Sequence, residues 1–446
     1  MFSVSRYRPL AALCLVLSLL VSACSGSPSA PGPAPTDTSP PPATEPAESG
    51  AGSRPPATVS VWSWRVQDEE LWQKVQERLN ANGENITIEF RGIKSTEYDA
   101  VLRTAMSGGD GPDIFTSRGG AGTRSYAEAG LIEPLDAIDL SGFDEGILQQ
   151  VSYEGQVYAV PFAVQTLTFF YNKTIFEENG LSEPKTWDEL MQIMETLKSR
   201  GITPIAIGGK DGYAVCLMVD VIGATWLGDQ WAQDVIAGRT DFTDPKFVDV
   251  LAKVDSLKQY AQDGFLGTAQ RDARTLFATG QTAIIIDGIW AVNTYYLQTD
   301  PDLQLGSFLA PPAREGDPVR IYPYVDGGYA VNSRSAVKEA ALRVAAYTAT
   351  AEFAQMYADL FAEIPGNKNV TFPADQPMLA KAVQQMNEVG LKTLFRIRSP
   401  FDSGTPDIST SLGANIQGMF AGQLTPQQAA ENVQSDLASW YPAFQK

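Results

Sequence analysis

Strand and helix patterns alternate along this chain from about Thr58 onward, and this alternation constrains the fold more than any other feature. Residues 59–63 and 85–90 are typical of short strands. Between them, apolar residues recur at the 3.6-residue spacing of an amphipathic helix, namely Leu71, Trp72, Val75 and Leu79. Strand–helix–strand alternation with short loops predicts an α/β domain with a largely parallel sheet.

The same alternation continues to the C-terminus. Further strands are predicted at residues 113–116, 166–172, 203–207, 283–286 and 327–331. Helices are predicted at residues 98–106 and 187–201, in a long alanine-rich stretch from about residue 337, and after Pro426. Thr186 and Glu189 predict a capping box at the start of the helix that ends near residue 201. Proline at the first position of the last helix is expected, because the N–H that it lacks has no partner within the helix there.

The first 57 residues are predicted to be an export signal and a tether. Residues 1–23 have a basic start and an apolar stretch that is too short to span a bilayer, and they read as a signal peptide. Small residues precede Cys24, as in a bacterial lipoprotein, so Cys24 is the predicted lipidation site. Residues 25–57 are mostly Ser, Pro, Ala, Gly and Thr, which predicts a disordered spacer. The alternative is an ordinary signal peptide whose cleavage site lies beside a cysteine.

The residue types that are absent exclude much catalytic chemistry. The chain has no histidine and three cysteines, Cys14, Cys24 and Cys216. Histidine-dependent triads and histidine-ligated zinc sites are therefore excluded, and the cysteines are too few for an all-cysteine zinc site. A formal charge of −19 argues against nucleic acid as a partner. We expect no enzyme activity, no metal and no cofactor, and a buried, inert thiol at Cys216.

Two weak patterns leave a catalytic alternative open. Ser335 and Lys338 match a short SxxK motif, for which a helix-start serine with an exposed lysine is the simpler interpretation. Asp287 and Asp326 could be the paired carboxylates of a glycosidase, although sequence alone cannot place them at the required separation.

Several segments in a fixed order resemble the extracellular solute-binding proteins (family 1) of ABC sugar importers, the family of maltose-binding protein. The most specific stretches are Tyr153–Phe162 (YEGQVYAVPF), Phe170–Lys173 (FYNK) and Pro184–Leu190 (PKTWDEL). Supporting segments are residues 111–115 (GPDIF), 130–135 (GLIEPL), 277–280 (FATG), 287–290 (DGIW) and 327–330 (GGYA). The resemblance covers residues 58–446.

The resemblance implies a type II periplasmic-binding-protein-like fold, with two α/β lobes, a ligand cleft between them and a hinge that the chain crosses several times. The N-terminal lobe would comprise residues 58–164 plus about 328–365, and the C-terminal lobe residues 165–327 plus about 366–446. The crossings would lie near residues 163–166, 326–328 and 364–370. It also implies a lipid-anchored, monomeric receptor on the outer side of the cell membrane that binds a carbohydrate and delivers it to an ABC permease.

Candidate ligand contacts follow from the loops at the carboxyl ends of the strands, where open α/β sheets bind ligands. Aromatic rings can stack on sugar faces, and polar side chains can bind hydroxyls. The candidates are Trp290, Gln165, Tyr213, Trp64, Gln67, Arg118, Arg65, Asp326, Trp226 and Asp287. By resemblance, Trp290 stands where such proteins stack a sugar, and Gln165 stands where maltose-binding protein has a ligand-contacting glutamate.

Other ligands and roles remain possible on the same fold. Arg65 and Arg118 could pair with the phosphate of a phosphorylated polyol, and carboxylates would suit a polyamine. A sensor subunit that reports ligand occupancy would have similar lobes. Asp113 is expected to brace its loop, and Trp187 is expected to pack in the interior.

Overall fold

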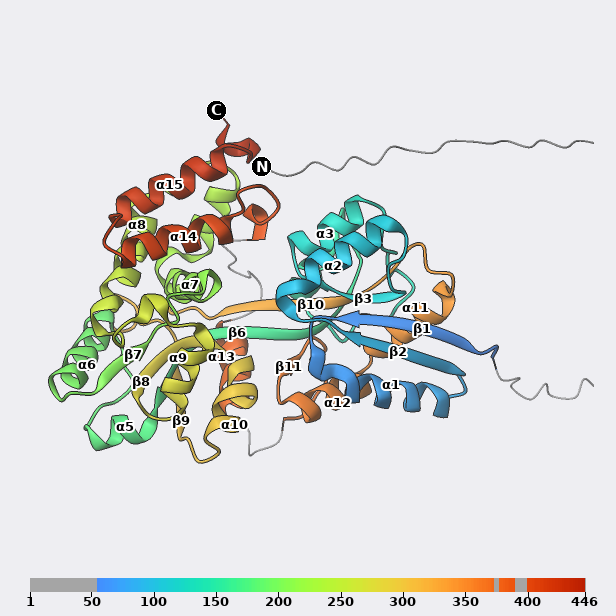
Figure 1. Cartoon of the computed structure of the whole chain (residues 1–446), viewed down its shortest axis with the longest axis horizontal. Coiled ribbons are helices and arrows are strands. Elements are labelled where there is room, and N and C mark those ends of the chain that lie inside the picture. Colours follow the sequence, from blue (N-terminus) through green and yellow to red (C-terminus); the bar gives the residue numbers. More distant parts are fainter. Residues whose placement is uncertain (1–53, 373–376, 390–398, 446) are drawn as a thin grey trace, which may run out of the picture. The chain divides into compact units, whose positions relative to one another are not determined.

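The computed structural model describes residues 54–372, 377–389 and 399–445 (Figure 1). These residues belong to one compact unit, Ser53–Lys446. The predicted signal peptide, the lipidation site at Cys24 and most of the tether lie outside the described residues.

One sheet of nine strands runs through the described body. Its path is β2-β1-β3-β10-β6-β8-β7, and β9 and β11 pair with β6 beside this path. The strands are β1 (Ala57–Ser63), β2 (Ile86–Gly92), β3 (Ile114–Arg118), β6 (Val160–Asn172), β7 (Thr203–Ala206), β8 (Thr282–Gly288), β9 (Leu305–Phe308), β10 (Tyr322–Val331) and β11 (Ile364–Pro365). A separate hairpin consists of β4 (Ser152–Tyr153) and β5 (Gln156–Val157).

The prediction of a largely parallel sheet is correct at the two ends and wrong in the middle. β1 pairs in parallel with β2 and β3, and β7 pairs in parallel with β8. β10 and β6 instead run antiparallel to each other, and each is antiparallel to its outer neighbour on the path, β3 and β8 respectively. Two long strands therefore join two parallel ends, as Figure 1 shows where β6 and β10 extend through the body.

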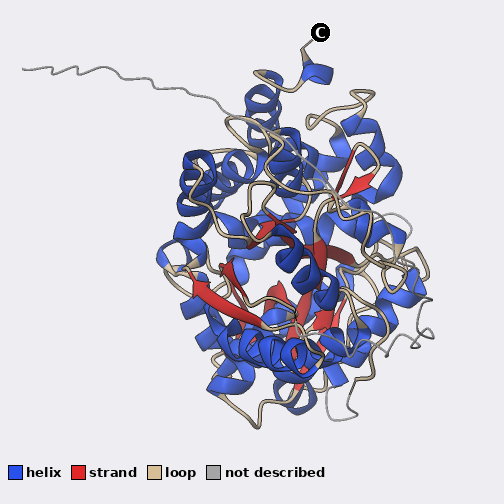
Figure 2. Cartoon of the chain, turned by 90° about the vertical axis from the view of Figure 1, so that its right-hand side faces the viewer, coloured by secondary structure: helices blue, strands red, loops and turns tan. Residues whose placement is uncertain are grey.

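Helices lie on both sides of the strands (Figure 2). Around β1–β3 are α1 (Glu69–Ala81), α2 (Ser95–Gly108), α3 (Ala121–Glu128), α11 (Lys338–Thr348) and α12 (Ala351–Phe361). The short helix α4 (Glu145–Gln149) contacts β4 and β6. The remaining helices are α5 (Lys173–Glu178), α6 (Trp187–Ser199), α7 (Gly212–Ile236), α8 (Pro245–Ser256), α9 (Gln270–Ala278), α10 (Leu297–Thr299), α13 (Pro377–Val389), α14 (Ile408–Phe420) and α15 (Pro426–Ala438).

Buried apolar side chains of the described residues form two large clusters, and the alternation of β6 separates them. Leu167 and Phe169 point into one cluster, together with residues of α6, α7, α8, α14 and α15. Phe170 points into the other, which continues from α9 to the helices around β1–β3. Because successive strand residues face opposite sides of a sheet, a strand buried on both faces is apolar along most of its length. All 13 residues of β6 are buried.

The pairing of β6 and β10 is irregular at one place, and this place coincides with two of the expected crossings. Val325 pairs with Val164, but the next pairs are Gly327 with Ala163 and Gly328 with Pro161. One residue is therefore left over on each strand, Asp326 on β10 and then Phe162 on β6. A bulge bends a strand and redirects its side chains, so this irregularity aims Asp326 differently from its neighbours.

Several local predictions can be compared directly with the structure. Leu71, Trp72, Val75 and Leu79 are the buried residues of α1, as the spacing predicted. Thr186 caps α6, but the Glu189 carboxylate accepts from the Lys185 amide rather than from the Thr186 amide, so the predicted capping box is only half correct. A complete capping box, formed by Thr425 and Gln428, opens α15.

The long helix predicted from residue 337 is instead two helices, α11 and α12. Thr350 lies between them, and its side chain accepts a hydrogen bond from the Phe353 amide as the N-cap of α12. A threonine cap favours a new helix start over continuation, which explains the break.

One helix of the described residues, α7, is long and apolar enough to cross a membrane by length and composition. However, 78% of its apolar window is buried inside the body, as in a core helix. Gly228 (φ 75°) interrupts its helical geometry. Cys216 lies on this helix and is buried, as predicted.

Candidate functional site

An aromatic corner lies where β8 ends beside the paired strands β6 and β10. Trp290 follows β8 directly and is partly buried, and its ring contacts Tyr324 edge-on with the ring centroids 6.3 Å apart. Gly288 makes room for the indole, because a Cβ at that position would lie 1.7 Å from Trp290 Cζ3. Tyr324 pairs with Gln165 across the two strands, so their side chains share one face of the sheet. The corner therefore combines two aromatic rings with a polar amide.

Gln165 carries an unsatisfied acceptor. Its side chain is 1% exposed, and its Nε2 donates to Glu363 Oε2 at 3.0 Å. Its Oε1 is buried and has no hydrogen-bond partner among the described residues. Burying a carbonyl oxygen without a hydrogen-bond partner costs free energy. A donor such as a hydroxyl or an amide group would therefore bind favourably to this oxygen.

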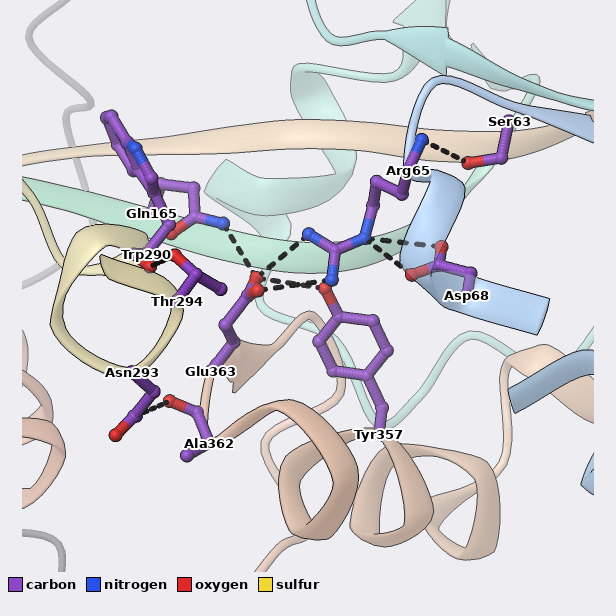
Figure 3. A network of polar contacts seen from close by, with 10 residues as sticks. All are labelled: Ser63, Arg65, Asp68, Gln165, Trp290, Asn293, Thr294, Tyr357, Ala362 and Glu363. Carbon is purple, nitrogen blue, oxygen red and sulfur yellow. Dashed lines mark hydrogen bonds and ion pairs between the residues drawn. The ribbon is translucent and has the colours of Figure 1, made fainter. Parts of the chain in front are cut away.

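Arg65 is held between two carboxylates beside this corner (Figure 3). Its Nε donates to Asp68 at 3.0 and 3.2 Å, and its two terminal nitrogens donate to Glu363 at 3.2 and 3.1 Å. Its guanidinium also lies 4.9 Å from the centroid of the Phe361 ring and 5.3 Å from that of Tyr357. The charge of Arg65 is thus balanced within the protein, and its predicted ligand contact stays a prediction.

Glu363 connects this network and was missed by the sequence analysis. It is 2% exposed and accepts four hydrogen bonds, two from Arg65 and one each from Gln165 and the Tyr357 hydroxyl, which lies at 3.0 Å. Arg65 is 298 positions away in the sequence, and no local motif surrounds Glu363. The sequence signal that lay beside it was the expected crossing near residues 364–370, which singled out no particular side chain.

Two carboxylates of this region, those of Asp68 and Asp326, have raised pKa values. Burial raises the pKa of Asp68 to about 7, although the ion pair with Arg65 partly opposes this effect. Burial also raises the pKa of Asp326, while the nearby Arg65 and Arg118 guanidinium groups favour its charged form. Asp326 as a residue is partly exposed at the bulge of β10, whereas Asp68 and Glu363 are buried.

Trp64 and Arg118 stack on each other on the β3 side of the bulge, where Arg118 pairs with Gly327 of β10. The Arg118 guanidinium lies 4.5 Å from the centroid of the Trp64 ring, and its Nε donates to Asp99 at 3.0 Å. Trp64 is 8% exposed and also contacts the Phe162 ring, whereas Arg118 is partly exposed. Gly327 permits this packing, because a Cβ there would lie 2.4 Å from Trp64 Cη2.

Asp287 forms the centre of a second buried network. Its carboxylate accepts from Arg274 at 2.6 and 2.9 Å, from Gln270 at 3.2 Å, from Tyr296 at 2.8 Å and from the Gly288 amide at 2.9 Å. It is 0% exposed. These five bonds use the acceptor capacity of the carboxylate within the protein.

Tyr213 lies near that network and is exposed. It is 49% exposed at the start of α7, and desolvation raises its pKa to about 12, with the Arg274 guanidinium opposing that rise. Tyr295 is 37% exposed, and the centroid of its ring lies 4.4 Å from the guanidinium carbon of Arg274. The two tyrosines therefore present aromatic surface outside the Asp287 network.

Two candidates lie apart from both networks in their contacts. Trp226 donates its indole N–H to the Pro311 carbonyl at 3.0 Å, and the Lys253 ammonium lies 3.7 Å from the centroid of its ring. Gln67 is exposed in the short 3₁₀ turn η1 (Val66–Asp68).

The two residues that were expected to be structural are confirmed as such. The Asp113 carboxylate accepts from the Ser60 amide at 2.8 Å and from the Ser335 hydroxyl at 2.6 Å, which braces its loop. Trp187 is 8% exposed and packs against Trp226. Ser335, the serine of the SxxK pattern, is thus used in the Asp113 bond, while Lys338 pairs with Glu133 at 2.6 Å.

The structure thus brings six of the ten candidates into one region around the bulge. The six are Trp290, Gln165, Asp326, Arg65, Trp64 and Arg118. Tyr213, Trp226 and Asp287 belong to other surroundings, and Gln67 is an exposed residue of η1 next to Asp68. Among the described residues, no group of three or more histidine, cysteine or acidic side chains has the arrangement of a metal site. The region instead combines aromatic surface, an unpaired acceptor and a partly exposed aspartate, which suits a polar ligand with flat apolar faces.

Comparison with known proteins gives a consistent family assignment. The model of the family described as bacterial extracellular solute-binding protein matches residues 63–355. This is a family of binding proteins rather than an enzyme class.

Individual relatives cover much of the chain at low identity. An uncharacterised ABC transporter extracellular-binding protein of Pyrococcus horikoshii is 23% identical over 85% of this chain and 84% of its own length. The maltotriose-binding protein of Pyrococcus abyssi is 26% identical over 56% of this chain and 52% of its own length. The diacetylchitobiose-binding protein of Streptomyces coelicolor is 25% identical over 62% of this chain and 65% of its own length.

Solved structures show the same fold. A chitin oligosaccharide binding protein superimposes with a TM-score of 0.74 at 27% identity, covering 86% of this chain and 99% of its own. A solute-binding protein in complex with raffinose superimposes with a TM-score of 0.71 at 20% identity, covering 87% of this chain and 100% of its own. The predicted type II periplasmic-binding-protein-like fold, with two lobes, is confirmed.

Proposed function

This chain belongs to the bacterial extracellular solute-binding protein family, and we propose that it captures a carbohydrate and delivers it chemically unchanged to the permease of an ABC importer. Relatives that bind maltotriose and diacetylchitobiose support a carbohydrate as the ligand. The single observation that carries the proposal is the corner formed by Trp290, Tyr324 and Gln165. It offers aromatic surface beside a buried acceptor that has no partner among the described residues.

A sugar would satisfy each part of this corner. The apolar C–H face of a pyranose would stack on the Trp290 indole, and a hydroxyl at the ring edge would donate to Gln165 Oε1. The carboxylate of Asp326 would accept from a second hydroxyl. Trp64 and Arg118 would approach the same ligand from the side of β1–β3. Tyr213, at the start of α7, would extend the aromatic surface on the opposite side of the ligand. A ligand that contacts both lobes binds the closed conformation more tightly than the open one, and it thereby favours closure.

The hinge for such a closure would be the region of the irregular pairing. The proposed lobes are residues 58–164 plus about 328–365 and residues 165–327 plus about 366–446. The chain would cross between them at β6, β10 and β11. β6 pairs with both of the other crossing strands, and two opposite bulges allow local bending without loss of the outer pairs. A micromolar dissociation constant would be typical of such a receptor, and it corresponds to a binding free energy of about −8 kcal/mol.

Anchoring and delivery complete the proposal. Cleavage before Cys24 and lipidation of that cysteine would anchor the protein on the outer side of the cell membrane. The proline-rich tether would let the body reach the permease as a monomer. No catalytic step is proposed, because the five hydrogen bonds of Asp287 oppose its use as one of a pair of catalytic carboxylates.

Isothermal titration calorimetry tests the proposal. The protein is titrated with monosaccharides, maltotriose, raffinose and diacetylchitobiose, and with a polyamine and glycerol phosphate as charged alternatives. We expect one of the sugars to bind and Trp290→Ala to weaken that binding at least 100-fold. Trp62→Ala is the matched control, because Trp62 is also half-buried but stacks on Arg91 of β2. Binding of only a charged ligand, or equal effects of the two substitutions, would overturn the proposal.

A further inference from the structure

A π-helical turn directly follows the aromatic corner. This turn, η4 (Val292–Tyr296), begins two residues after Trp290, and the Thr294 hydroxyl donates to the Trp290 carbonyl. π turns are rare and often occur at functional sites. The position of the indole is therefore tied to the geometry of this turn.

One side chain of the turn reaches a distant segment. Asn293 is partly buried, and its Nδ2 donates to the Ala362 carbonyl at 3.1 Å, although the two residues are 69 positions apart. Ala362 ends α12 and precedes β11, and Glu363 follows it. The bond thus joins the segment that carries Trp290 to the segment that carries Glu363, as Figure 3 shows.

Ala362 adopts an uncommon backbone conformation. Its φ and ψ angles are 49° and 45°, in the left-handed region that residues with a Cβ rarely adopt. This conformation turns the chain out of α12 so that Glu363 meets Arg65, Gln165 and Tyr357. Such a conformation persists only where neighbouring contacts stabilise it, and the bond from Asn293 is one of those contacts.

We propose that Asn293 is a positioning residue for ligand binding. By holding the Ala362 carbonyl of the other proposed lobe, its amide sets, in this conformation, the distance between the stacking indole of Trp290 and the Glu363 carboxylate that orients Gln165. A ligand that contacts both Trp290 and Gln165 then binds to two preorganised groups rather than to two independently moving ones. This inference rests on the proposed carbohydrate function and assigns a role to a residue that need not touch the ligand.

Ligand dissociation kinetics distinguish positioning from a purely structural role. The probe is the sugar that binds the unaltered protein most tightly in the calorimetric panel, and its release is followed by stopped-flow tryptophan fluorescence. Loss of one hydrogen bond of about 1 kcal/mol corresponds to about a five-fold change. We expect Asn293→Ala and Asn293→Asp to raise the dissociation rate constant at least about five-fold. The melting temperature of the unliganded protein should fall by no more than about 2 °C, because a loss of about 1 kcal/mol shifts the melting temperature little in a body of this size.

Two further variants complete the experiment. Asn293→Gln keeps a donor amide and should restore the dissociation rate constant to within about two-fold of the original. Asn179→Asp is the matched control, because the Asn179 amide also donates to a carbonyl, that of Ile175 at 2.8 Å, at the end of α5. It should leave ligand release unchanged.

The outcomes separate the two proposals. If a sugar binds the unaltered protein but Asn293→Ala and Asn293→Asp release it at the original rate, this inference is wrong and the proposed function stands. The inference is also wrong if these variants lower only the melting temperature of the free protein. If no sugar binds the unaltered protein, the proposed function fails first.

Discussion

The substitution Glu363→Gln tests the buried network most severely, because it keeps the shape of the side chain and removes its charge. Glu363 accepts four hydrogen bonds at 3.0 to 3.2 Å and has 2% of its surface exposed. An amide would place an NH2 group against donors in either orientation, because Arg65 approaches one oxygen and Arg65, Gln165 and Tyr357 approach the other.

The expected loss can be estimated from the contacts. Breaking a buried ion pair by removing one partner typically costs about 3–5 kcal/mol. Asp68 remains as a second partner for Arg65 at 3.0 Å, so we expect the lower end, about 3 kcal/mol of unfolding free energy. We also expect weaker sugar binding, since an amide oxygen is a weaker acceptor for the Gln165 amide than a carboxylate and orients it less firmly.

Urea unfolding followed by tryptophan fluorescence measures this change. Glu352→Gln is the matched control, because Glu352 pairs with Arg78 at the surface with 50% of its side chain exposed. Exposed pairs contribute about 0–1 kcal/mol, so this control should unfold almost as the original protein does. Equal unfolding free energies for the two variants would refute the assignment of Glu363 as the centre of the network.

Three other predictions follow from the same region. The raised pKa of Asp68, about 7 when folded against about 3.9 in an unfolded chain, means that the folded protein binds this proton more tightly. The contribution of Asp68 to the unfolding free energy should therefore fall as pH rises from about 4 to about 7. Asp68→Asn should remove this contribution, which is measured as the difference between the two proteins in urea titrations at several pH values. Gly288→Ala should displace the Trp290 indole, because the new Cβ would lie 1.7 Å from it, and should weaken sugar binding at least about ten-fold in calorimetry; unchanged affinity would contradict the corner. Gly327→Ala would place a Cβ 2.4 Å from Trp64 and 2.6 Å from a backbone oxygen, which should cost about 1–3 kcal/mol in urea unfolding; a neutral effect would show that this packing is loose.

Local features of this fold are readable in the sequence because they depend on near neighbours. The spacing of Leu71, Trp72, Val75 and Leu79 predicted the buried face of α1, and Thr425 with Gln428 set the start of α15. The break between α11 and α12 was also signalled, by Thr350, but the alanine-rich composition on both sides concealed it.

The sheet pairing was less predictable. Alternating strands and helices predict parallel neighbours, but β6 and β10 pair across long sequence separations and run antiparallel. The bulges at Asp326 and Phe162 arise from that pairing and have no local signature. Residue types therefore indicated the class of fold, whereas the arrangement of the crossing strands required the structure.

The candidate contacts show the same division. Trp290, Gln165 and Asp326 lie together, but whether they touch the ligand stays a prediction. Arg65 and Asp287 were selected as charged residues near strand ends, yet both are engaged by partners that sequence could not reveal, such as Glu363 and Arg274. An ion pair between residues far apart in the chain uses side chains that look free in the sequence.

A crystal structure of the protein with its tightest-binding sugar tests the central claim most directly. We predict a sugar ring stacked on the Trp290 indole, with one of its hydroxyls donating to Gln165 Oε1. A sugar bound away from β6, β10 and the end of β8, with that oxygen still unpaired, would contradict the account.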